Sequence, residues 1–262
     1  MRTAEAFAKT KAEGRAALVG YLPAGFPTLA DSIKAIDIMI DHGADIIEVG
    51  LPYSDPVMDG PAIQRAADRA LAAGFRTRQA FEVVEAVAGR VPILIMTYWN
   101  LVERYGVDVF ARDFAAAGGA GLITPDLIPD EAEEWLTASD AHDLDRIFLV
   151  APSSTEERIA ATVRACRGFV YAQSVMGVTG ARAATSTAAP ALVERTRAHT
   201  DLPIGVGLGV RDGDQAAEVA SYGDAVIVGS AIVGCYLETD DIPSGHQRLA
   251  DLTADLAAGV RR

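Results

Sequence analysis

The hydrophobic residues of this chain gather in short runs that recur from one end to the other. The runs are largely continuous and rich in β-branched residues, without a strict polar–apolar alternation. Continuous apolar runs are typical of parallel strands that are covered on both faces. We therefore predict eight buried strands, within residues 16–22, 44–50, 91–98, 119–125, 146–152, 168–174, 202–208 and 223–230.

Segments rich in alanine, glutamate and arginine separate these runs, and their apolar residues have helical spacing. Ile33, Ile36 and Ile40 repeat on one side of such a segment. Ser154, with Glu157 three residues later, predicts the start of another helix as a capping box. The chain therefore alternates strands with helices.

This alternation predicts a parallel α/β fold. Eight strand–helix units in about 250 residues favour a closed (β/α)₈ barrel, the TIM-barrel architecture. A doubly wound open sheet remains the alternative, because the number of strands does not establish closure. No linker or low-complexity tract divides the chain, so we expect residues 1–262 to form a single domain.

Three segments add to the minimal pattern. Residues 1–15 are charged and helical in character and predict an extra N-terminal helix. The connection after the second strand holds a proline-rich loop and two helices, near 61–73 and 78–89. Residues 173–190, after the sixth strand, are small and polar and predict a long mobile loop. In a barrel, loops that follow strands form the active face, so both long loops lie where chemistry is expected.

Charge and composition narrow the class of partner. The net charge of −13 argues against nucleic acid and against an anionic membrane surface, because both require a basic face. No apolar stretch approaches the length of a membrane span and no signal-peptide pattern begins the chain, so we expect a cytoplasmic protein. Cys166 and Cys235 form no CxxC motif, and the histidines lack metal-ligand spacing. We expect neither a disulfide framework nor a metal site.

Three carboxylates follow the second predicted strand closely. Glu48 lies near the end of that strand, where apolar neighbours would desolvate its carboxyl group and raise its pKa toward neutrality. Asp55 and Asp59 follow on the proline-rich loop. Each alone has a structural explanation, as an ion pair for Glu48 and as turn or cap residues for the aspartates. Together, at one barrel mouth, they form a candidate acid–base group.

Glycines follow the last three predicted strands, in GVTG (177–180), GLG (207–209) and GSAIV (229–233). Loops after strands seven and eight, with a short helix, form the recurrent phosphate site of TIM barrels. Ser230 would add a hydroxyl group to such a site. The alternative is that these glycines serve turns and helix packing. The GxGxG spacing of residues 205–209 does not match the GxGxxG of dinucleotide-binding folds.

Other side chains at predicted strand ends would face the same mouth. Tyr171 could offer its hydroxyl group to a ligand. Tyr21, Met96 and Tyr98 could line an apolar pocket. Packing in the barrel core explains all four equally well.

The order of these motifs resembles that of the tryptophan synthase α subunit family, and the resemblance covers essentially the whole chain. It rests on YLPAGFP (21–27), IEVGLPYSDPVMDGPAIQ (47–64), MTYWN (96–100), PDL (125–127), VAPSST (150–155), GVTG (177–180) and GSAIV (229–233). Departures are modest: Tyr53 stands where the family commonly has phenylalanine, and SVM (174–176) replaces a segment that often carries arginine or threonine.

The resemblance implies a TIM barrel that cleaves indole-3-glycerol phosphate to indole and glyceraldehyde 3-phosphate, without a metal or organic cofactor. It implies that Glu48 is the general acid and base, that Asp59 binds the indole N–H, and that Tyr171 lies near the reacting glycerol. It assigns the substrate phosphate to positions matching or adjoining Gly180, Gly209, Gly229 and Ser230. The remaining pocket residues would be Tyr21, Met96, Tyr98 and Thr179.

The family resemblance also implies a partner, the tryptophan synthase β subunit, in an α₂β₂ heterotetramer. Asp55 is expected to serve loop structure or signalling to that partner. Three alternatives remain at this point: a free-standing indole-releasing lyase, another phosphate-binding barrel isomerase, and a barrel that regulates a partner without turnover.

Overall fold

The computed structural model describes residues 2–173, 188–207, 209–239 and 241–262. Strands are formed by short apolar runs, each buried along most of its length. They are β1 (Ala17–Pro23), β2 (Ile46–Gly50), β3 (Ile93–Met96), β4 (Gly121–Ile123), β5 (Asp145–Ile147), β6 (Leu149–Val150), β7 (Val170–Gln173), β8 (Ile204–Gly207) and β9 (Ala225–Val228).

These strands form one parallel sheet in the order β5-β4-β3-β2-β1-β9-β8-β7-β6. The two strands at the ends of this order are consecutive in the chain and are separated only by Phe148. β5 pairs with β4, and β6 pairs with β7. The sheet therefore closes on itself, which confirms the predicted TIM barrel and removes the open-sheet alternative.

The predicted strand at 146–152 is wrong in one respect, because the structure divides it into β5 and β6. The division reflects a change of hydrogen-bonding partner. Arg146 and Arg167 form an isolated antiparallel bridge, while the carbonyl of Phe148 accepts from the Tyr171 N–H at 3.1 Å. Phe148 itself is fully buried. One strand position thus appears as two short strands that together close the barrel.

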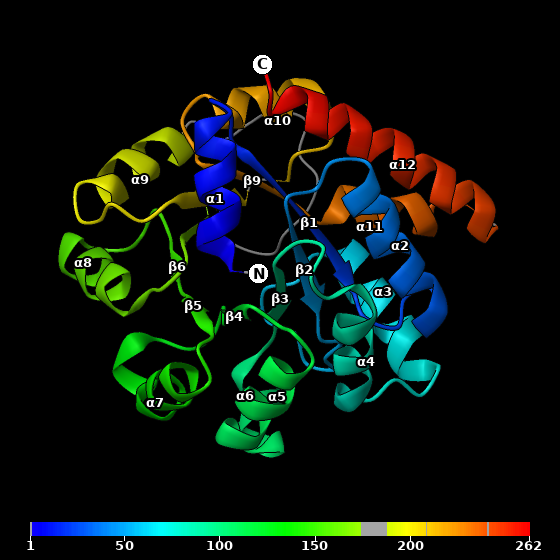
Figure 1. The fold of residues 1–262 in the computed structure, drawn as a ribbon, viewed down its shortest axis with the longest axis horizontal. Helices are drawn as coiled ribbons and strands as arrows, with labels where there is room; N and C mark the ends of the chain where they lie inside the picture. Colours follow the sequence, from blue (N-terminus) through cyan, green and yellow to red (C-terminus); the bar gives the residue numbers. More distant parts are fainter. Residues whose placement is uncertain (1, 174–187, 208, 240) are drawn as a thin grey trace.

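Helices surround the barrel and cover its outer face, as Figure 1 shows from one end of the barrel. They are α1 (Thr3–Ala12), α2 (Leu29–Asp41), α3 (Pro61–Ala72), α4 (Thr77–Val87), α5 (Trp99–Tyr105), α6 (Val107–Ala116), a 3₁₀ turn (Pro129–Glu131), α7 (Glu133–Ala141), α8 (Glu156–Ala165), α9 (Ala188–Arg197), α10 (Gly213–Ala220), α11 (Ser230–Leu237) and α12 (Ile242–Gly259).

The predicted extra N-terminal helix and the two helices after the second strand are confirmed as α1, α3 and α4. The predicted capping residue of α8 is wrong by one position: Thr155, not Ser154, accepts from the Arg158 N–H, at 3.2 Å. The predicted loop 173–190 is shorter than expected, because Gln173 ends β7 and residues 188–190 begin α9. Its remaining residues, 174–187, lie outside the described part of the chain.

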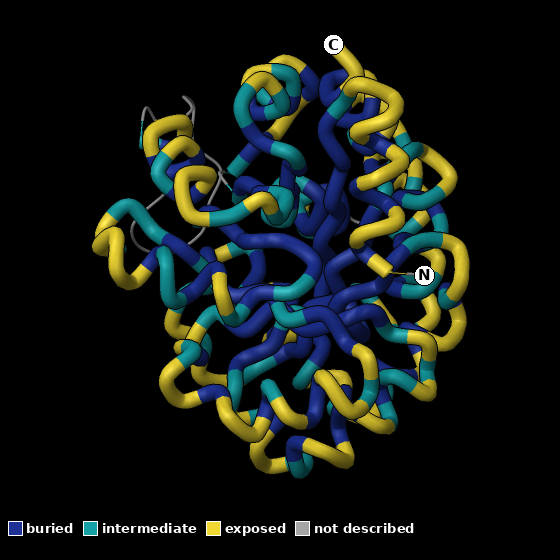
Figure 2. The backbone as a smooth tube through the Cα atoms, turned by 60° about the vertical axis from the view of Figure 1, so that its left-hand side comes forward, coloured by how far each residue is buried: buried dark blue, intermediate teal, exposed yellow. Residues whose placement is uncertain are grey.

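Two hydrophobic layers result from the alternation of side chains along each strand. Outward-facing strand residues pack under the helices in the larger layer. Figure 2 shows the buried backbone segments gathered at the centre of the molecule, with exposed segments around them. The inward-facing residues form a separate cluster that fills the barrel, made mainly of Ala17, Val19, Ile46, Leu94, Ile123, Ile147, Phe169, Tyr171, Ala225 and Ile227.

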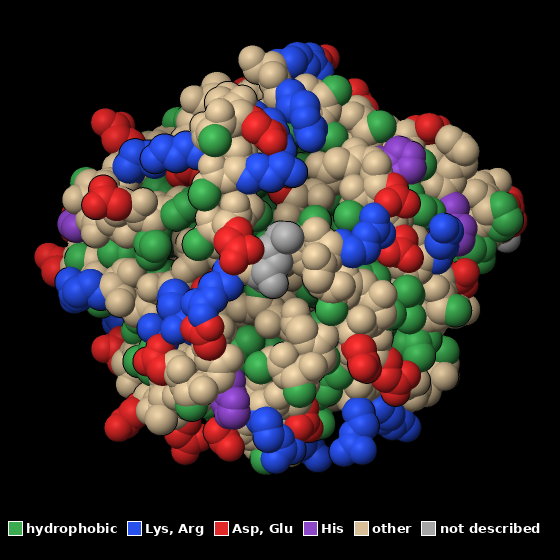
Figure 3. Space-filling view, in the orientation of Figure 1, with side chains coloured by type: hydrophobic (Ala, Val, Ile, Leu, Met, Phe, Trp, Pro, Cys, Tyr) green, Lys and Arg blue, Asp and Glu red, His purple; other side chains and the backbone are tan. Residues whose placement is uncertain are grey.

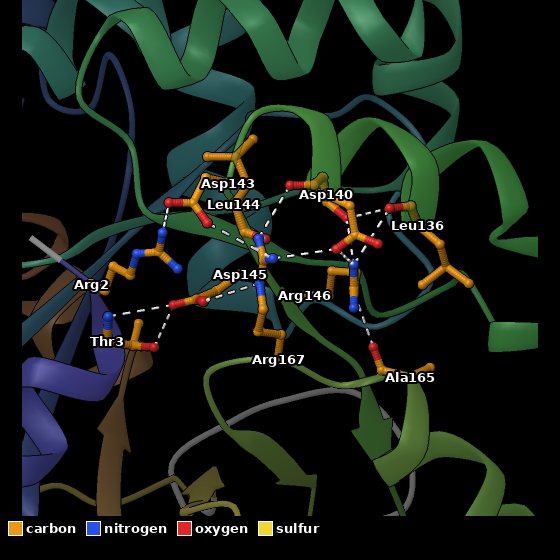
Figure 4. Close-up of polar contacts among 11 residues, drawn as sticks. Arg2, Thr3, Leu136, Asp140, Asp143, Leu144, Asp145, Arg146, Ala165 and Arg167 are labelled. Atoms are coloured by element: carbon orange, nitrogen blue, oxygen red, sulfur yellow. Dashed lines mark hydrogen bonds and ion pairs between the residues drawn. The ribbon is translucent and has the colours of Figure 1, made fainter.

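Helix α1 covers the N-terminal end of the barrel and lies across the centre of the ring in Figure 1. The ring of Phe7 packs on that of Phe169, with centroids 5.5 Å apart. The Thr3 hydroxyl donates to the buried Asp145 Oδ2 at 2.5 Å, and Arg167 Nε lies 3.7 Å from Asp145 Oδ1. Figure 4 shows this network, in which the first turn of α1 is attached to the start of β5. The opposite, C-terminal end of the barrel carries the loops in which the candidate residues lie.

Charges of both signs are interspersed over the face shown in Figure 3, and neither sign occupies it alone. Within the described ranges, every helix is too short or too polar to cross a membrane.

We predict that Thr3→Val lowers the free energy of unfolding by about 1–3 kcal/mol, because it removes a hydroxyl donor from a buried carboxylate. The measurement is urea unfolding followed by circular dichroism. Thr10→Val is the matched control, since Thr10 is equally buried on the same helix but its hydroxyl bonds only the Phe7 carbonyl, at 3.2 Å. Equal losses for the two variants would contradict the role given to Asp145.

Candidate active site at the C-terminal end of the barrel

Glu48 lies in the middle of β2, in register with Tyr21 of β1 and Leu94 of β3. Its side chain points into the barrel, since it shares a face with Ile46 of the inner cluster. The residue is only 1% exposed, and Glu48 Oε1 has no hydrogen-bond partner among the described residues. Burial raises the pKa of this carboxyl group from its ordinary value to about 8. At neutral pH the group is therefore largely protonated and able to donate.

Two buried tyrosines adjoin this carboxyl group. Burial raises the pKa of Tyr21 and of Tyr171, and the charge of Glu48 raises both further. Their hydroxyl groups therefore remain protonated near Glu48.

Two strand glycines make room for these rings. A Cβ atom on Gly50 would lie 2.3 Å from the Tyr21 hydroxyl oxygen, and one on Gly207 would lie 2.4 Å from the Tyr171 hydroxyl oxygen. Such distances are impossible without displacement of the ring. This role of Gly50 and Gly207 was not predicted from the sequence, although a single glycine inside an apolar strand run signals a close approach of another group.

Asp59 lies on the loop between β2 and α3, and Tyr98 holds its side chain. The Tyr98 hydroxyl donates to Asp59 Oδ1 at 2.9 Å and accepts from the Met58 N–H at 3.0 Å. The Gln64 side chain of α3 donates to the Asp59 carbonyl at 2.7 Å. Burial raises the pKa of Asp59, and the hydrogen bond from Tyr98 opposes that rise. The half-buried carboxylate is thus fixed by the loop, by α3 and by Tyr98.

Asp55, the third carboxylate of the stretch, makes no hydrogen bond with Glu48 or Asp59 among the described residues. Its side chain is exposed and accepts from the Ser54 hydroxyl at 2.5 Å. The structure therefore gives it a place in the turn, and the predicted convergence of three carboxylates reduces to two.

The glycines after β8 and β9 lie at the same end of the barrel. Gly209 has a φ of +75°, a left-handed conformation that favours glycine. Gly229 precedes α11, and a Cβ atom there would lie 3.3 Å from Tyr21 Cδ1, so the start of α11 adjoins Tyr21. No side-chain hydrogen bond from a described residue caps α11. The N–H groups of its first turn, beginning at Ser230, are therefore oriented to receive an anion.

The structure brings most of the predicted residues to one end of the barrel. The Tyr21 hydroxyl lies among them, since the charges of four others raise its pKa: Asp59, Glu48, Tyr98 and Tyr171. Met96 ends β3 beside Gly50 and packs against the inner cluster. Thr179 and Gly180 lie outside the described residues. In the described part of the chain, no group of three or more His, Cys, Asp or Glu side chains is arranged to hold a metal ion.

This chain is similar to known proteins over nearly its whole length. The family model described as "Tryptophan synthase alpha chain" matches residues 7–260. The tryptophan synthase alpha chain of Salinispora arenicola is 63% identical over 98% of this chain and 96% of its own, and that of Acidothermus cellulolyticus is 64% identical over the same shares.

Solved structures agree with these sequence relatives. A structure of Mycobacterium tuberculosis tryptophan synthase superimposes with a TM-score of 0.94 at 59% identity, covering 100% of this chain and 98% of the other. The tryptophan synthase subunit alpha of Legionella pneumophila superimposes with a TM-score of 0.89 at 30% identity, covering 99% and 98%. The fold is therefore retained even where the sequence identity falls from 59% to 30%.

We predict that Glu48→Gln raises the free energy of unfolding by roughly 2–4 kcal/mol at pH 8.5 and changes it much less at pH 5. The pKa of Glu48 is about 8 in the fold and near its ordinary value when unfolded. The stability contributed by its neutral form is therefore complete at acid pH and is lost as the pH rises toward 8. Urea unfolding at both pH values measures the difference, with Glu82→Gln, on the exposed side of α4, as the control. A gain that is the same at both pH values would contradict the burial of an unpaired carboxyl group.

Proposed function

The chain belongs to the tryptophan synthase alpha chain family, and we propose that Glu48, Asp59 and Tyr171 are the residues with which it cleaves indole-3-glycerol phosphate to indole and glyceraldehyde 3-phosphate. The reaction is a carbon–carbon lyase step, a retro-aldol cleavage in the biosynthesis of tryptophan. The observation that carries the assignment is the buried Glu48 carboxyl group, whose Oε1 has no hydrogen-bond partner among the described residues and which two tyrosines adjoin at the substrate end of the barrel.

The bond that breaks joins the indole ring to the glycerol side chain. In the first step the neutral Glu48 carboxyl group gives its proton to the ring carbon that carries the side chain, and the ring nitrogen takes the positive charge. In the second step the Glu48 carboxylate removes the proton of the adjacent glycerol hydroxyl. The carbon–carbon bonding pair then moves into the ring, which neutralises the nitrogen and releases indole and the aldehyde. Glu48 regains its proton, so the cycle needs no external acid or base.

The raised pKa of Glu48 suits both steps, because a group that titrates near the working pH exchanges protons efficiently in either direction. Asp59 has the complementary role. Its carboxylate would accept a hydrogen bond from the ring N–H and stabilise the positive charge that develops there. The Tyr171 hydroxyl, protonated because of its burial, would bind the reacting glycerol.

The phosphate of the substrate would bind at Gly209, Gly229 and Ser230, together with Thr179 and Gly180 of the loop after β7. Uncapped N–H groups at the start of α11 supply hydrogen bonds and the positive end of the helix dipole. Local donors are required here because the chain as a whole carries a net charge of −13. Binding the phosphate fixes the ring between Glu48 and Asp59.

The partner of this chain is the tryptophan synthase β subunit, which condenses indole with serine, and we expect an α₂β₂ heterotetramer. Two exposed hydrophobic side chains support docking of the β subunit at the C-terminal end of the barrel. Val57 is 71% exposed on the loop after β2, and Ile128 is 42% exposed after β4. We propose that both face the β subunit, that residues 1–262 act as a single domain, and that the complex works in the cytoplasm.

We predict that the wild-type chain with its β subunit releases indole from indole-3-glycerol phosphate, and that Glu48→Gln lowers kcat by about 10²- to 10⁴-fold. Asp59→Asn should lower kcat by about tenfold or more, because it weakens a charge-assisted hydrogen bond. Glu82→Gln and Asp68→Asn, exposed on α4 and α3, are the matched controls.

The outcomes of this assay separate the alternatives. A wild-type complex that releases no indole would refute the lyase assignment and leave a regulator or another barrel isomerase. Rapid release without the β subunit would indicate a free-standing enzyme. Near-full activity of Glu48→Gln would refute the acid–base assignment alone.

We also predict a limb in the pH profile of the wild-type complex. Because the first step uses the protonated form of Glu48, kcat should fall as the pH rises through about 8. Steady-state indole release between pH 6 and 9.5 measures this limb, with β-subunit turnover from added indole as the control. A constant kcat up to pH 9.5 would show that Glu48 is not the proton donor.

A further inference from the structure

We propose that Tyr98 is a positioning residue, which holds the Asp59 carboxylate in place. Contacts of the next two residues, Trp99 with Asp126 and Asn100 with Tyr53, fix the segment that carries Tyr98. The proposal rests on the lyase function given above. The sequence predicts Tyr98 either in an apolar pocket or in the core, and the contacts of its hydroxyl group indicate a different role.

Both hydrogen-bonding capacities of the Tyr98 hydroxyl are used on one loop. It accepts from the Met58 N–H and donates to Asp59 Oδ1, so it contacts backbone and side chain of successive residues. Tyr98 is 5% exposed, which keeps the phenol ring from turning away. Because the proton of the hydroxyl points at Asp59, the pair favours an ionised carboxylate that can accept a further hydrogen bond at Oδ2.

A second contact connects the same loop to the start of α5. The ring of Tyr53 packs on that of Tyr98, with centroids 5.3 Å apart. The Asn100 side-chain amide donates to the Tyr53 hydroxyl at 3.1 Å. The hydroxyl group that distinguishes Tyr53 from phenylalanine is therefore engaged by α5. The loop that carries Asp59 is attached to residues 98–100 at both of its ends.

A third contact fixes residues 98–100 themselves. The carboxylate of Asp126, in the loop after β4, accepts from the Trp99 N–H at 2.9 and 3.2 Å. It thereby binds the first N–H of α5, which no side-chain bond from Tyr98 caps. Three successive residues at the end of β3 thus connect the loops after β2 and β4. The position of Asp59 depends on this connection through Tyr98.

Titratable groups near Asp59 come from several elements. Tyr98 contacts Asp59 directly. The charges of Asp59 and of Glu48, on β2, both raise the pKa of Tyr21, on β1. The tyrosines remain protonated across the working pH range. Loss of the Tyr98 hydroxyl therefore removes the contact that opposes the burial of the Asp59 charge.

The test is Tyr98→Phe, assayed as indole release in complex with the β subunit. It keeps the ring and its packing on Tyr53 but removes the hydrogen bond to Asp59. We expect kcat to fall by about tenfold, because misplacement of a charge-stabilising group costs rate rather than substrate affinity. KM should change by less than about threefold. On the acid side of the profile, kcat should fall where Asp59 becomes protonated. In Tyr98→Phe this fall should move to higher pH, because Asp59 then ionises less readily.

Tyr105→Phe is the matched control, because it removes a tyrosine-to-aspartate hydrogen bond of the same length, 2.9 Å to Asp113, from the far end of α5. We expect its kcat and pH profile to match those of the wild type. Thermal unfolding of each variant identifies any loss caused by general destabilisation.

A double variant separates positioning from structure. If Tyr98 acts through Asp59, Tyr98→Phe should lower the residual kcat of Asp59→Asn by less than about twofold. An active wild type with an unaltered Tyr98→Phe profile, or equal losses in both backgrounds, would overturn the proposal while leaving the lyase function intact. An inactive wild type would instead refute the lyase function.

Discussion

The hydrogen bonds that join residues 145–150 to β4 on one side and to β7 on the other determine the rest of the structure. They close the parallel sheet, so every strand has an inside and an outside. In a closed barrel, alternate residues of each strand point inward and outward, so the position of a residue along its strand decides which way its side chain points. Glu48, Tyr21 and Tyr171 face one another because each occupies an inward position in a ring that has no edge.

An enclosed interior also explains the electrostatics of the site. Apolar neighbours and tyrosine rings replace water around Glu48, and this desolvation raises its pKa to about 8. The same burial that would suit the group to the proposed proton transfer makes its charged form costly to the fold. The barrel accommodates this cost through the large apolar layers inside and outside the sheet. The N-terminal end is stabilised separately, where α1 contacts Asp145 and Phe169.

The candidate site combines a rigid part with a loop part. Glu48 and Tyr171 belong to strands, so their positions are set by the ladder of backbone hydrogen bonds. Asp59 belongs to a loop, and its position depends on contacts from Tyr98 and Gln64 instead. Exposed Val57, which we propose to face the β subunit, lies two residues before Asp59. The proposed partner contact and the placement of the Asp59 carboxylate therefore concern the same few residues.

Local patterns were sufficient for the strand runs, for the helices α1, α3 and α4, and for the burial of the Glu48 carboxyl group. Apolar periodicity and burial are largely properties of neighbouring residues. The order of motifs was sufficient for the family. Only the tertiary structure decided four features: the split between β5 and β6, the clearance that Gly50 and Gly207 give to tyrosine rings, the exposure of Asp55, and the bond from Tyr98 to Asp59. Each depends on a pairing between residues distant in the chain, and such pairings exist only once the barrel has closed.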